Sequence, residues 1–414
     1  MKTPYLFWSG DGSILPLALK IKAEGHPVSL YIHAPEARDI GRGLLPKTTS
    51  PDPPPRSIVV FDGIGHGAAG TVYRKQGHPV IGGNPFDTSL EKDRMEGARL
   101  MKQVGIRVPE THPFRSLQTA MRFLEGHPGK WFVKVSGDQV ESDTYDAPDS
   151  EAMIRYLKWC DLKGGKVEPF ELQKKAQGTE LSLNGWFDGD HFLGPYEYTL
   201  EEKRFLTGEL GPRTGCESNL VWFAKDTTLA EKVLVPMEPI LAREGYVGPL
   251  DLNMLLDEDG EPIGLEWTAR LGFDATYAWM SLLDHVGAQL EAFAIGTLSQ
   301  WETKPGKALT LRITVPPYPT WDPKLVKKIQ GLPVDPKVLS QSPVDVMQTP
   351  EGLCAAGGSG IICTVGSVGT DLKAVRKAVL EVSESLVIPN KQFRIDPVSR
   401  ADRDLATLGK LGVV

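Results

Sequence analysis

The chain has 414 residues, of which 41% are hydrophobic and 24% are charged. This length and composition are typical of a globular protein with two or three domains around sizeable cores. The formal net charge of −7 argues against a general nucleic-acid binder, because binding along phosphates requires a basic surface. A local basic pocket for a small anion remains compatible with this charge.

Cysteine usage and hydropathy both favour a cytoplasmic protein. No Cys-x-x-Cys pair or histidine spacing indicates a zinc site, so we expect reduced thiols at Cys160, Cys216, Cys354 and Cys363. The apolar run at the N-terminus is too short for a signal peptide. No later stretch reaches the roughly 18 apolar residues that a membrane span needs.

The first 86 residues form the first expected domain, in which short apolar strands alternate with helical stretches. Strands are predicted at 4–8, 27–32, 57–63 and 78–83, and helices at 14–25 and 68–77. This alternation predicts a parallel, doubly wound sheet. The "SGDGS" turn at 9–13 either holds a phosphate at a helix N-terminus or is an ordinary strand-to-helix turn.

The second expected domain covers residues 87–302. A long helix is predicted within 84–111, capped by Asp87, Thr88 or Ser89 and closed by Gly105. Two stretches, 170–194 and 245–270, each read as strands joined by a tight turn, which predicts β-hairpins.

A third, smaller α+β domain is expected over 303–414. Its predicted elements are strands at 308–315 and 359–369 and one helix at 371–387.

Two charged residues inside apolar strands point to a binding site. Lys134 lies within "KWFVKVSGD", where a lysine is costly unless its ammonium meets an anion. The alternative is an edge lysine that reaches solvent. Glu180 lies in "QGTELS", and its alternative is a carboxylate on the solvent face of a half-buried strand.

The last hairpin of the second domain carries a candidate metal site. Glu266 and Thr268 are two residues apart and so point to one face of a strand. Asn253 lies across the turn from Glu266, and such hard oxygens suit Mg²⁺. Arg270 follows, and its guanidinium suits phosphate or carboxylate oxygens.

These elements, in this order, resemble the ATP-grasp ligases, and more narrowly glycinamide ribonucleotide synthetase (phosphoribosylamine–glycine ligase). "SLEKDRMEGARLMKQVGIRVPET" resembles that family's helix before the ATP site, with Arg94 where the family has a phosphate-binding lysine. "WFVKVSGD" resembles the strand that carries the nucleotide-binding lysine, here Lys134. "LQKKAQGTELS" resembles the hinge, where Gln173 to Ala176 would line the adenine pocket and Glu180 would accept from the ribose hydroxyls.

Two further motifs extend the resemblance toward the substrates, and the C-terminal residues 359–386 resemble the family's last domain. "KRFLTGELGPRTGCES" keeps the family's spacing of Lys-Arg and Gly-Pro-Asn-Thr-Gly-Gly. "GLEWTARLGFD" resembles the metal-binding strand Glu-Phe-Asn-x-Arg-Phe-Gly, with Glu266 as its first ligand.

The resemblance implies an ATP-grasp fold of three parts: an N-terminal doubly wound α/β domain, a central ATP-grasp domain with a lid at about 128–190, and a C-terminal α+β domain. It implies ATP and Mg²⁺ (or Mn²⁺) as cofactors. The implied catalytic residues are Arg270, Lys203 and Arg204, and the implied nucleotide-binding residues are Arg94, Lys134, Gln173, Lys174, Ala176 and Glu180. The implied metal ligands are Glu266, Asn253 and Thr268, and the implied substrate-binding residues are Gly211, Arg213, Thr214, Gly215 and Asp274.

Departures from the family concentrate on the acceptor side. "SGDGSILPL" lacks the family's Gly-Gly-Arg-Glu-His-Ala segment, and "RLGFDATY" replaces its Gly-Asp-Pro-Glu-Thr-Gln. The loop after Lys134 is acidic and has no second lysine. Arg213 stands where Asn is usual, Cys216 where Gly is usual, and Thr268 where the family has a metal-binding Asn.

The sequence therefore predicts an ATP-dependent carboxylate–amine ligase that works through an acyl phosphate. Its expected partners are small molecules, an amino acid carboxylate such as glycine and an amine other than phosphoribosylamine. The first alternative is glycinamide ribonucleotide synthetase itself, and the second is a non-catalytic nucleotide-binding protein. A monomer or a homodimer is expected, without a membrane partner.

Overall fold

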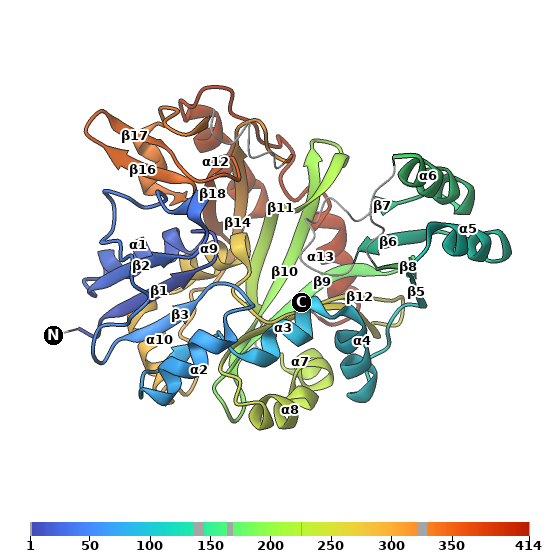
Figure 1. Cartoon of the computed structure of the whole chain (residues 1–414), viewed down its shortest axis with the longest axis horizontal. Coiled ribbons are helices and arrows are strands. Elements are labelled where there is room, and N and C mark those ends of the chain that lie inside the picture. The colour runs from blue at the N-terminus through green and yellow to red at the C-terminus, as the bar shows by residue number, and fades with distance from the viewer. Residues whose placement is uncertain (1, 136–144, 164–168, 225, 321–328, 414) are drawn as a thin grey trace.

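The computed structural model describes residues 2–135, 145–163, 169–224, 226–320 and 329–413 (Figure 1). The acidic loop predicted after Lys134 lies almost wholly outside these residues. In the part of the chain that is described, no helix is long and apolar enough to cross a membrane.

The N-terminal domain is the predicted parallel, doubly wound sheet, with strand order β2-β1-β3-β4. Alternate residues of β1 point to opposite faces: Tyr5 and Phe7 pack with helix α1, and Leu6 and Trp8 pack with Tyr73 of helix α2. The elements are β1 (Tyr5–Ser9), α1 (Leu15–Ala23), β2 (Val28–Ile32), a 3₁₀ turn η1 (Pro35–Ala37), β3 (Ile58–Phe61), α2 (Gly67–Lys75) and β4 (Val80–Ile81).

The single long helix predicted within 84–111 is wrong, because the chain forms two helices, α3 (Pro85–Lys92) and α4 (Arg94–Gln103). Asn84 caps α3 through a capping box with Asp87. The break falls at Asp93, whose side chain accepts from the Glu96 backbone N–H and so starts a new helix. The break sets Arg94 at the first position of α4.

A small four-stranded sheet, β5-β8-β6-β7, forms a layer of its own with two helices packed on it (Figure 1). Its core is separate from the main core and includes Trp131, Leu172 and Met153. This layer corresponds to the predicted lid but begins earlier and ends earlier than 128–190. Its elements are β5 (Thr111–Phe114), α5 (Leu117–Gly126), β6 (Trp131–Val135), β7 (Tyr145–Asp146), α6 (Ser150–Lys163) and β8 (Phe170–Lys174).

The centre of the molecule is an eight-stranded sheet in the order β13-β12-β9-β10-β11-β14-β18-β15. Both predicted hairpin turns are present, joining β9 to β10 and β12 to β13. The sheet continues across the predicted boundary at residue 302, because β11 pairs with β14. Its strands are β9 (Thr179–Phe187), β10 (Phe192–Leu206), β11 (Leu210–Ala224), β12 (Gly248–Leu256), β13 (Pro262–Thr268), β14 (Lys307–Thr314), β15 (Ser342–Pro343) and β18 (Ile361–Gly369).

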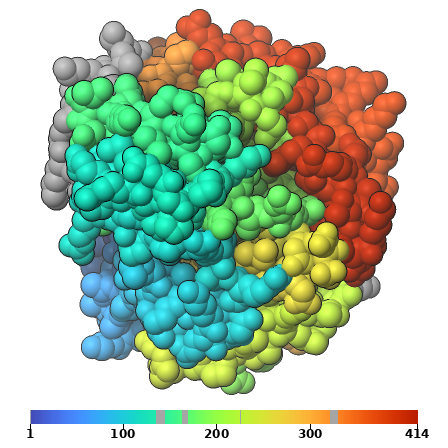
Figure 2. Space-filling model, turned by 90° about the vertical axis from the view of Figure 1, so that its right-hand side faces the viewer, coloured from blue at the N-terminus to red at the C-terminus, as the bar shows by residue number. Residues whose placement is uncertain are grey.

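Helices and a small hairpin complete the fold. The predicted C-terminal helix is α12, and Asp371 caps it through two backbone N–H groups. Figure 2 shows that the small sheet layer (teal to green) and the C-terminal segment (red) reach the same face of the molecule. The remaining elements are α7 (Thr228–Val233), η3 (Val235–Met237), α8 (Glu238–Arg243), α9 (Phe273–Ser281), α10 (Val286–Ala294), η4 (Pro336–Ser340), β16 (Val346–Thr349), β17 (Gly352–Ala355), α12 (Leu372–Ser385) and α13 (Ala401–Lys410).

Candidate active site

A cavity of about 540 Å³ lies between the small sheet and the large sheet. We call it the nucleotide cavity, because the residues predicted to bind a nucleotide line it. Eight Lys and Arg side chains line it against three carboxylates, which favours an anionic ligand. All six residues predicted to bind the nucleotide line this cavity, as do five others from the predicted set: Arg94, Lys134, Gln173, Lys174, Ala176 and Glu180, with Asn253, Glu266, Lys203, Arg213 and Thr214.

One end of this cavity is apolar and suits a flat ring. Phe132, Leu255 and Leu265 contribute the apolar surface, and the chain from Gln173 to Ala176, at the end of β8 and just beyond it, lines the same cavity. Glu180 follows on β9 and faces the same cavity. This places the predicted hinge and the predicted ribose acceptor around one space.

The other end is organised around Glu266, which three cations surround. Arg94 Nη1 lies 3.1 Å from Glu266 Oε2, and Lys203 Nζ lies 3.9 Å from Glu266 Oε1. Burial raises the pKa of Glu266, but the charges of Lys203, Arg94 and Lys134 outweigh burial and lower it to about 2. Burial lowers the pKa of Lys134 to about 8, against the opposing effect of Glu266. Near neutral pH this end carries net positive charge.

Asn253 and Glu266 stand directly opposite each other on β12 and β13, so their side chains share one face. Carboxylate and amide oxygens are a donor set that fits Mg²⁺, with waters and phosphate oxygens in the remaining positions. Thr268 lies one row further along and does not line the nucleotide cavity. No cluster of three His, Cys, Asp or Glu suited to a metal occurs among the described residues.

A second cavity, of about 720 Å³, adjoins the first and shares Arg94, Arg213, Thr214 and Glu266 with it. It lies between the N-terminal domain, the large sheet and the C-terminal domain. The predicted substrate residues Gly215 and Asp274 line it, together with Thr268 and Arg270. Two cavities that meet at Glu266 suit a reaction between two bound substrates.

Two residues of this second cavity are engaged by the protein itself. Arg270 Nε lies 2.9 Å from Glu91 Oε1, and the other oxygen of Glu91 accepts from the Ala269 backbone N–H. Asp274 pairs with buried Arg312 and accepts from Thr364 Oγ1 at 2.7 Å. Asp274 therefore connects α9 to β14 and β18. Because these contacts already occupy its carboxylate, the structure gives little support to the predicted role of Asp274 in substrate binding.

Arg204 and Gly211 line neither cavity, contrary to their predicted roles. Arg204 Nη1 donates to the Gly211 carbonyl at 2.8 Å, and Nη2 lies 2.7 Å from Asp146 Oδ1 on β7. The reason is that the protein itself occupies both terminal nitrogens of its guanidinium, at a point where the β10–β11 register is irregular on both sides of Arg204. Arg204 instead fastens the β10–β11 hairpin to the small sheet.

The "SGDGS" turn does not present its backbone N–H groups to a ligand. Gly10 N–H donates to Asp62 Oδ1, Gly12 N–H donates to Ser9 Oγ, and Ser13 N–H donates to Asp11 Oδ1. The nearby carboxylates also oppose a phosphate. The ordinary-turn alternative therefore fits the structure better.

The C-terminal segment contributes to the nucleotide cavity, which the sequence did not indicate. Arg400, Arg403, Asp404 and Thr407, at the start of α13 and along it, line the cavity. Their pattern is that of any amphipathic surface helix, so no local signal could have identified them.

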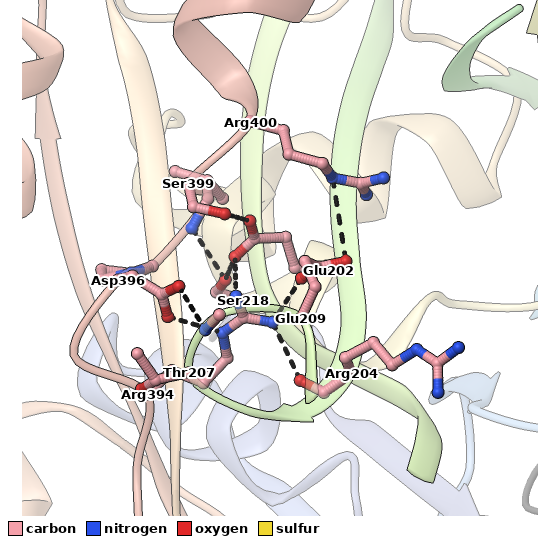
Figure 3. A network of polar contacts seen from close by, with 12 residues as sticks. Glu202, Arg204, Thr207, Glu209, Ser218, Arg394, Asp396, Ser399 and Arg400 are labelled. Carbon is pink, nitrogen blue, oxygen red and sulfur yellow. Dashed lines mark hydrogen bonds and ion pairs between the residues drawn. The ribbon is translucent and has the colours of Figure 1, made fainter. Parts of the chain in front are cut away.

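A buried arginine anchors this segment (Figure 3). Arg394 is fully buried; its Nη1 lies 2.7 Å from Glu209 Oε1, and its Nε lies 3.0 Å from Asp396 Oδ1. Its Nη2 lies 3.4 Å from Glu202 Oε2. The network joins the start of the C-terminal segment to the hairpin that bears Lys203.

The arrangement of the sheets around the two adjoining cavities is that of the ATP-grasp fold. The solved phosphoribosylamine–glycine ligase of Thermotoga maritima superposes with a TM-score of 0.73 at 20% identity, covering 96% of this chain and 100% of that one. The biotin carboxylase domain of the Hydrogenobacter thermophilus 2-oxoglutarate carboxylase, solved with MgADP and bicarbonate, gives a TM-score of 0.61 at 12% identity, covering 95% and 92%.

Within that fold, the sequence is similar to phosphoribosylamine–glycine ligases. The enzyme of Leifsonia xyli subsp. xyli is 24% identical over 343 residues, which is 79% of this chain and 80% of the relative. No family model matches the chain.

Proposed function

We propose that this protein is an ATP-dependent carboxylate–amine ligase that forms an amide and releases ADP and phosphate. The observation that carries the proposal is the position of Glu266, which lies among Arg94, Lys134 and Lys203 where the nucleotide cavity meets the second cavity. Relatives of this sequence and fold are ligases of that class, which supports it.

In the first step, a substrate carboxylate oxygen attacks the γ-phosphorus of ATP. The bond from that phosphorus to the β–γ bridging oxygen breaks, which gives an acyl phosphate and ADP. Arg94, Lys134 and Lys203 offset the charge that crowds together when two anions meet. A magnesium ion held by Glu266 and Asn253 would add charge neutralisation on the phosphate oxygens.

In the second step, the amine nitrogen attacks the carbonyl carbon, loses a proton and expels phosphate. The acyl phosphate must be kept from water, or it hydrolyses. The small sheet layer over the nucleotide cavity suits that purpose, as closing lids do in other enzymes.

The comparisons favour glycine and phosphoribosylamine as the substrate pair. The departures of the N-terminal turn and of "RLGFDATY" favour a different amine, but the similar sequences of Leifsonia xyli and Lactococcus lactis are both named phosphoribosylamine–glycine ligases. The non-catalytic alternative is also less well supported, since Lys134, Glu180 and Glu266 line one cavity. We therefore place glycine and phosphoribosylamine first.

Incubation with MgATP, glycine and phosphoribosylamine tests the proposal, with ADP, phosphate and the amide followed together. Amide formation with this pair supports the named pair. Amide with another amine only would retain the ligase and replace the acceptor. Nucleotide binding without turnover across a panel of amines and carboxylates would reject the proposal.

A further inference from the structure

A third cavity, of about 100 Å³, lies where the two large cavities meet. It shares Lys203, Asn253 and Glu266 with the nucleotide cavity, and Thr268 and Arg270 with the second cavity. Its volume is below the roughly 300 Å³ at which pockets for larger ligands begin. Only a small molecule, or one end of a molecule, fits there.

The wall of this small cavity consists of two rows of polar side chains on one face of the large sheet. Residues directly opposite on neighbouring strands share a face, and the cross-strand pairings of β13, β12, β9 and β10 place four residues in each row. The outer row, on the nucleotide side, is Glu266, Asn253, Ser182 and Thr199. The inner row is Thr268, Asp251, Asn184 and Glu197.

The inner row holds more hydrogen-bond acceptors than the protein satisfies. Asn184 Nδ2 donates to Glu197 Oε2 at 3.0 Å, but Asn184 Oδ1 is buried and has no partner within the described ranges. The Asp251 carboxylate likewise accepts no hydrogen bond from the described residues. Burial raises the pKa of Glu197 to about 7.

Asn253 adds an independent observation in the outer row. Its side chain is only 5% exposed, and its Oδ1 is buried without a hydrogen-bond partner among the described residues. Orphaned buried acceptors are rare and costly in folded proteins. Two of them, on Asn184 and Asn253, lie around one small cavity beside the carboxylates of Asp251 and Glu197, which favours a ligand that donates several hydrogen bonds and carries positive charge.

Positively charged side chains lie at the mouth of the small cavity. Lys203 and Arg270 stand on the sides shared with the nucleotide cavity and the second cavity respectively. The far end is closed by Trp186 stacked on Trp279 with ring centroids 5.1 Å apart, and the indole Nε1 of each is buried without a hydrogen-bond partner among the described residues. The small cavity thus has acceptors inside, cations at its mouth and a floor that limits ligand size.

We propose that this small cavity binds the ammonium group of a small amino acid, through the carboxylates of Asp251 and Glu197 and through Asn184 Oδ1, while Asn253 Oδ1 stays available to the proposed magnesium ion. An ammonium group has three N–H donors and no acceptor, so it can pair with the unsatisfied hydrogen-bond acceptors of the inner row. The amino acid's carboxylate then faces Lys203 and Arg270, beside the γ-phosphate position. This inference rests on the proposed function and names the side chains that select the carboxylate substrate.

The inference makes selectivity depend on the amino group. A carboxylate without that group leaves the buried acceptors unpaired, and sites built to bond a polar group reject analogues that lack it. Glycine and acetate differ by this group alone. We accordingly expect the cavity to bind glycine more tightly than acetate, before either carboxylate reacts with ATP.

Isothermal titration of the full chain tests this, with a magnesium complex of a non-hydrolysable ATP analogue present and glycine or acetate as titrant. We expect glycine to bind at least tenfold more tightly than acetate. Asp251→Asn and Glu197→Gln each lower glycine affinity at least tenfold, while affinity for the ATP analogue changes less than twofold. Asp190→Asn, which changes a carboxylate 97% exposed on the β9–β10 connection, is the matched control and binds glycine as the unaltered protein does.

Equal binding of glycine and acetate, or full glycine affinity in Asp251→Asn, overturns the inference, and the small cavity then holds water only. The proposed ligase survives that result if carboxylate-dependent ADP release persists. Glycine binding that depends on Asp251 but leads to no ADP release with any amine supports the ammonium site and rejects the ligase.

Discussion

Arg94 Nη1 lies 3.1 Å from Glu266 Oε2, and this contact joins the start of α4 to the strand proposed to bind metal. Glu266→Gln removes the carboxylate that Arg94, Lys134 and Lys203 share. We expect kcat to fall at least a hundredfold, because the carboxylate both binds metal and keeps those cations in place. Steady-state ADP release measures this, and circular dichroism checks folding. Glu261→Gln, on the same hairpin and exposed, should keep full activity; an active Glu266→Gln variant would remove Glu266 from the site.

The pH dependence of nucleotide binding follows from Lys134. Burial lowers the pKa of its ammonium to about 8, so the free protein loses this positive charge as pH rises through 8. MgATP affinity should therefore decline between pH 7.5 and 9, which titration at each pH measures. Lys134→Arg keeps its charge throughout and should flatten the profile, while exposed Lys130→Met should leave it unchanged. An unaltered decline in Lys134→Arg would assign the titration to another group.

The sequence predicts which charged residues lie in apolar strands, but it does not predict the direction in which every side chain points. Lys134 and Glu266 were found because burying a charge is costly without a partner. Arg204 lies outside both cavities because its guanidinium contacts Gly211 and Asp146, and motif spacing, which gives order along the chain, carries no information on such contacts. The same rule applied to Asp251 and Glu197 would have marked the small cavity. The contribution of α13 depends on contacts across about two hundred residues, which no local pattern encodes.

Arg400 tests the contribution of the C-terminal segment to nucleotide binding. It lines the nucleotide cavity, and its Nη2 donates to the Glu201 carbonyl at 3.1 Å. Arg400→Ala should raise KM for ATP several-fold with little change in kcat, because it removes positive charge beside the ligand without touching the reacting atoms. Lys410→Ala, exposed on the same helix, is the control. A KM unchanged in Arg400→Ala would leave the segment a purely structural role.

The buried carboxyl group of Asp345 should make the free energy of unfolding depend on pH. Burial raises its pKa to about 7, although Ser359 donates to its carboxylate from both N–H and Oγ. A raised carboxyl pKa contributes stability that is complete below about pH 4 and is lost as pH rises to 7. The stability of Asp345→Asn relative to the unaltered protein should therefore rise between pH 5 and 8, by up to about 3 kcal/mol. Thermal unfolding at both pH values measures this difference, with exposed Glu258→Gln as control; a difference that does not grow with pH would contradict it.

Arg394 should be the most sensitive position outside the cavities. Its guanidinium is fully buried and meets Glu209, Asp396 and Glu202 (Figure 3). Arg394→Met leaves those carboxylates without their buried partner, and breaking such a group typically costs about 3–5 kcal/mol. Chemical denaturation measures the loss. Arg155→Met offers a matched control, because Arg155 is 68% exposed and pairs with the Glu151 carboxylate, which is 88% exposed, and surface pairs contribute about 0–1 kcal/mol. Because the same network holds the segment leading into α13, Arg394→Met should also raise KM for ATP at temperatures where the chain is still folded. Normal nucleotide affinity in a destabilised Arg394→Met variant would show that the segment keeps its place without this arginine.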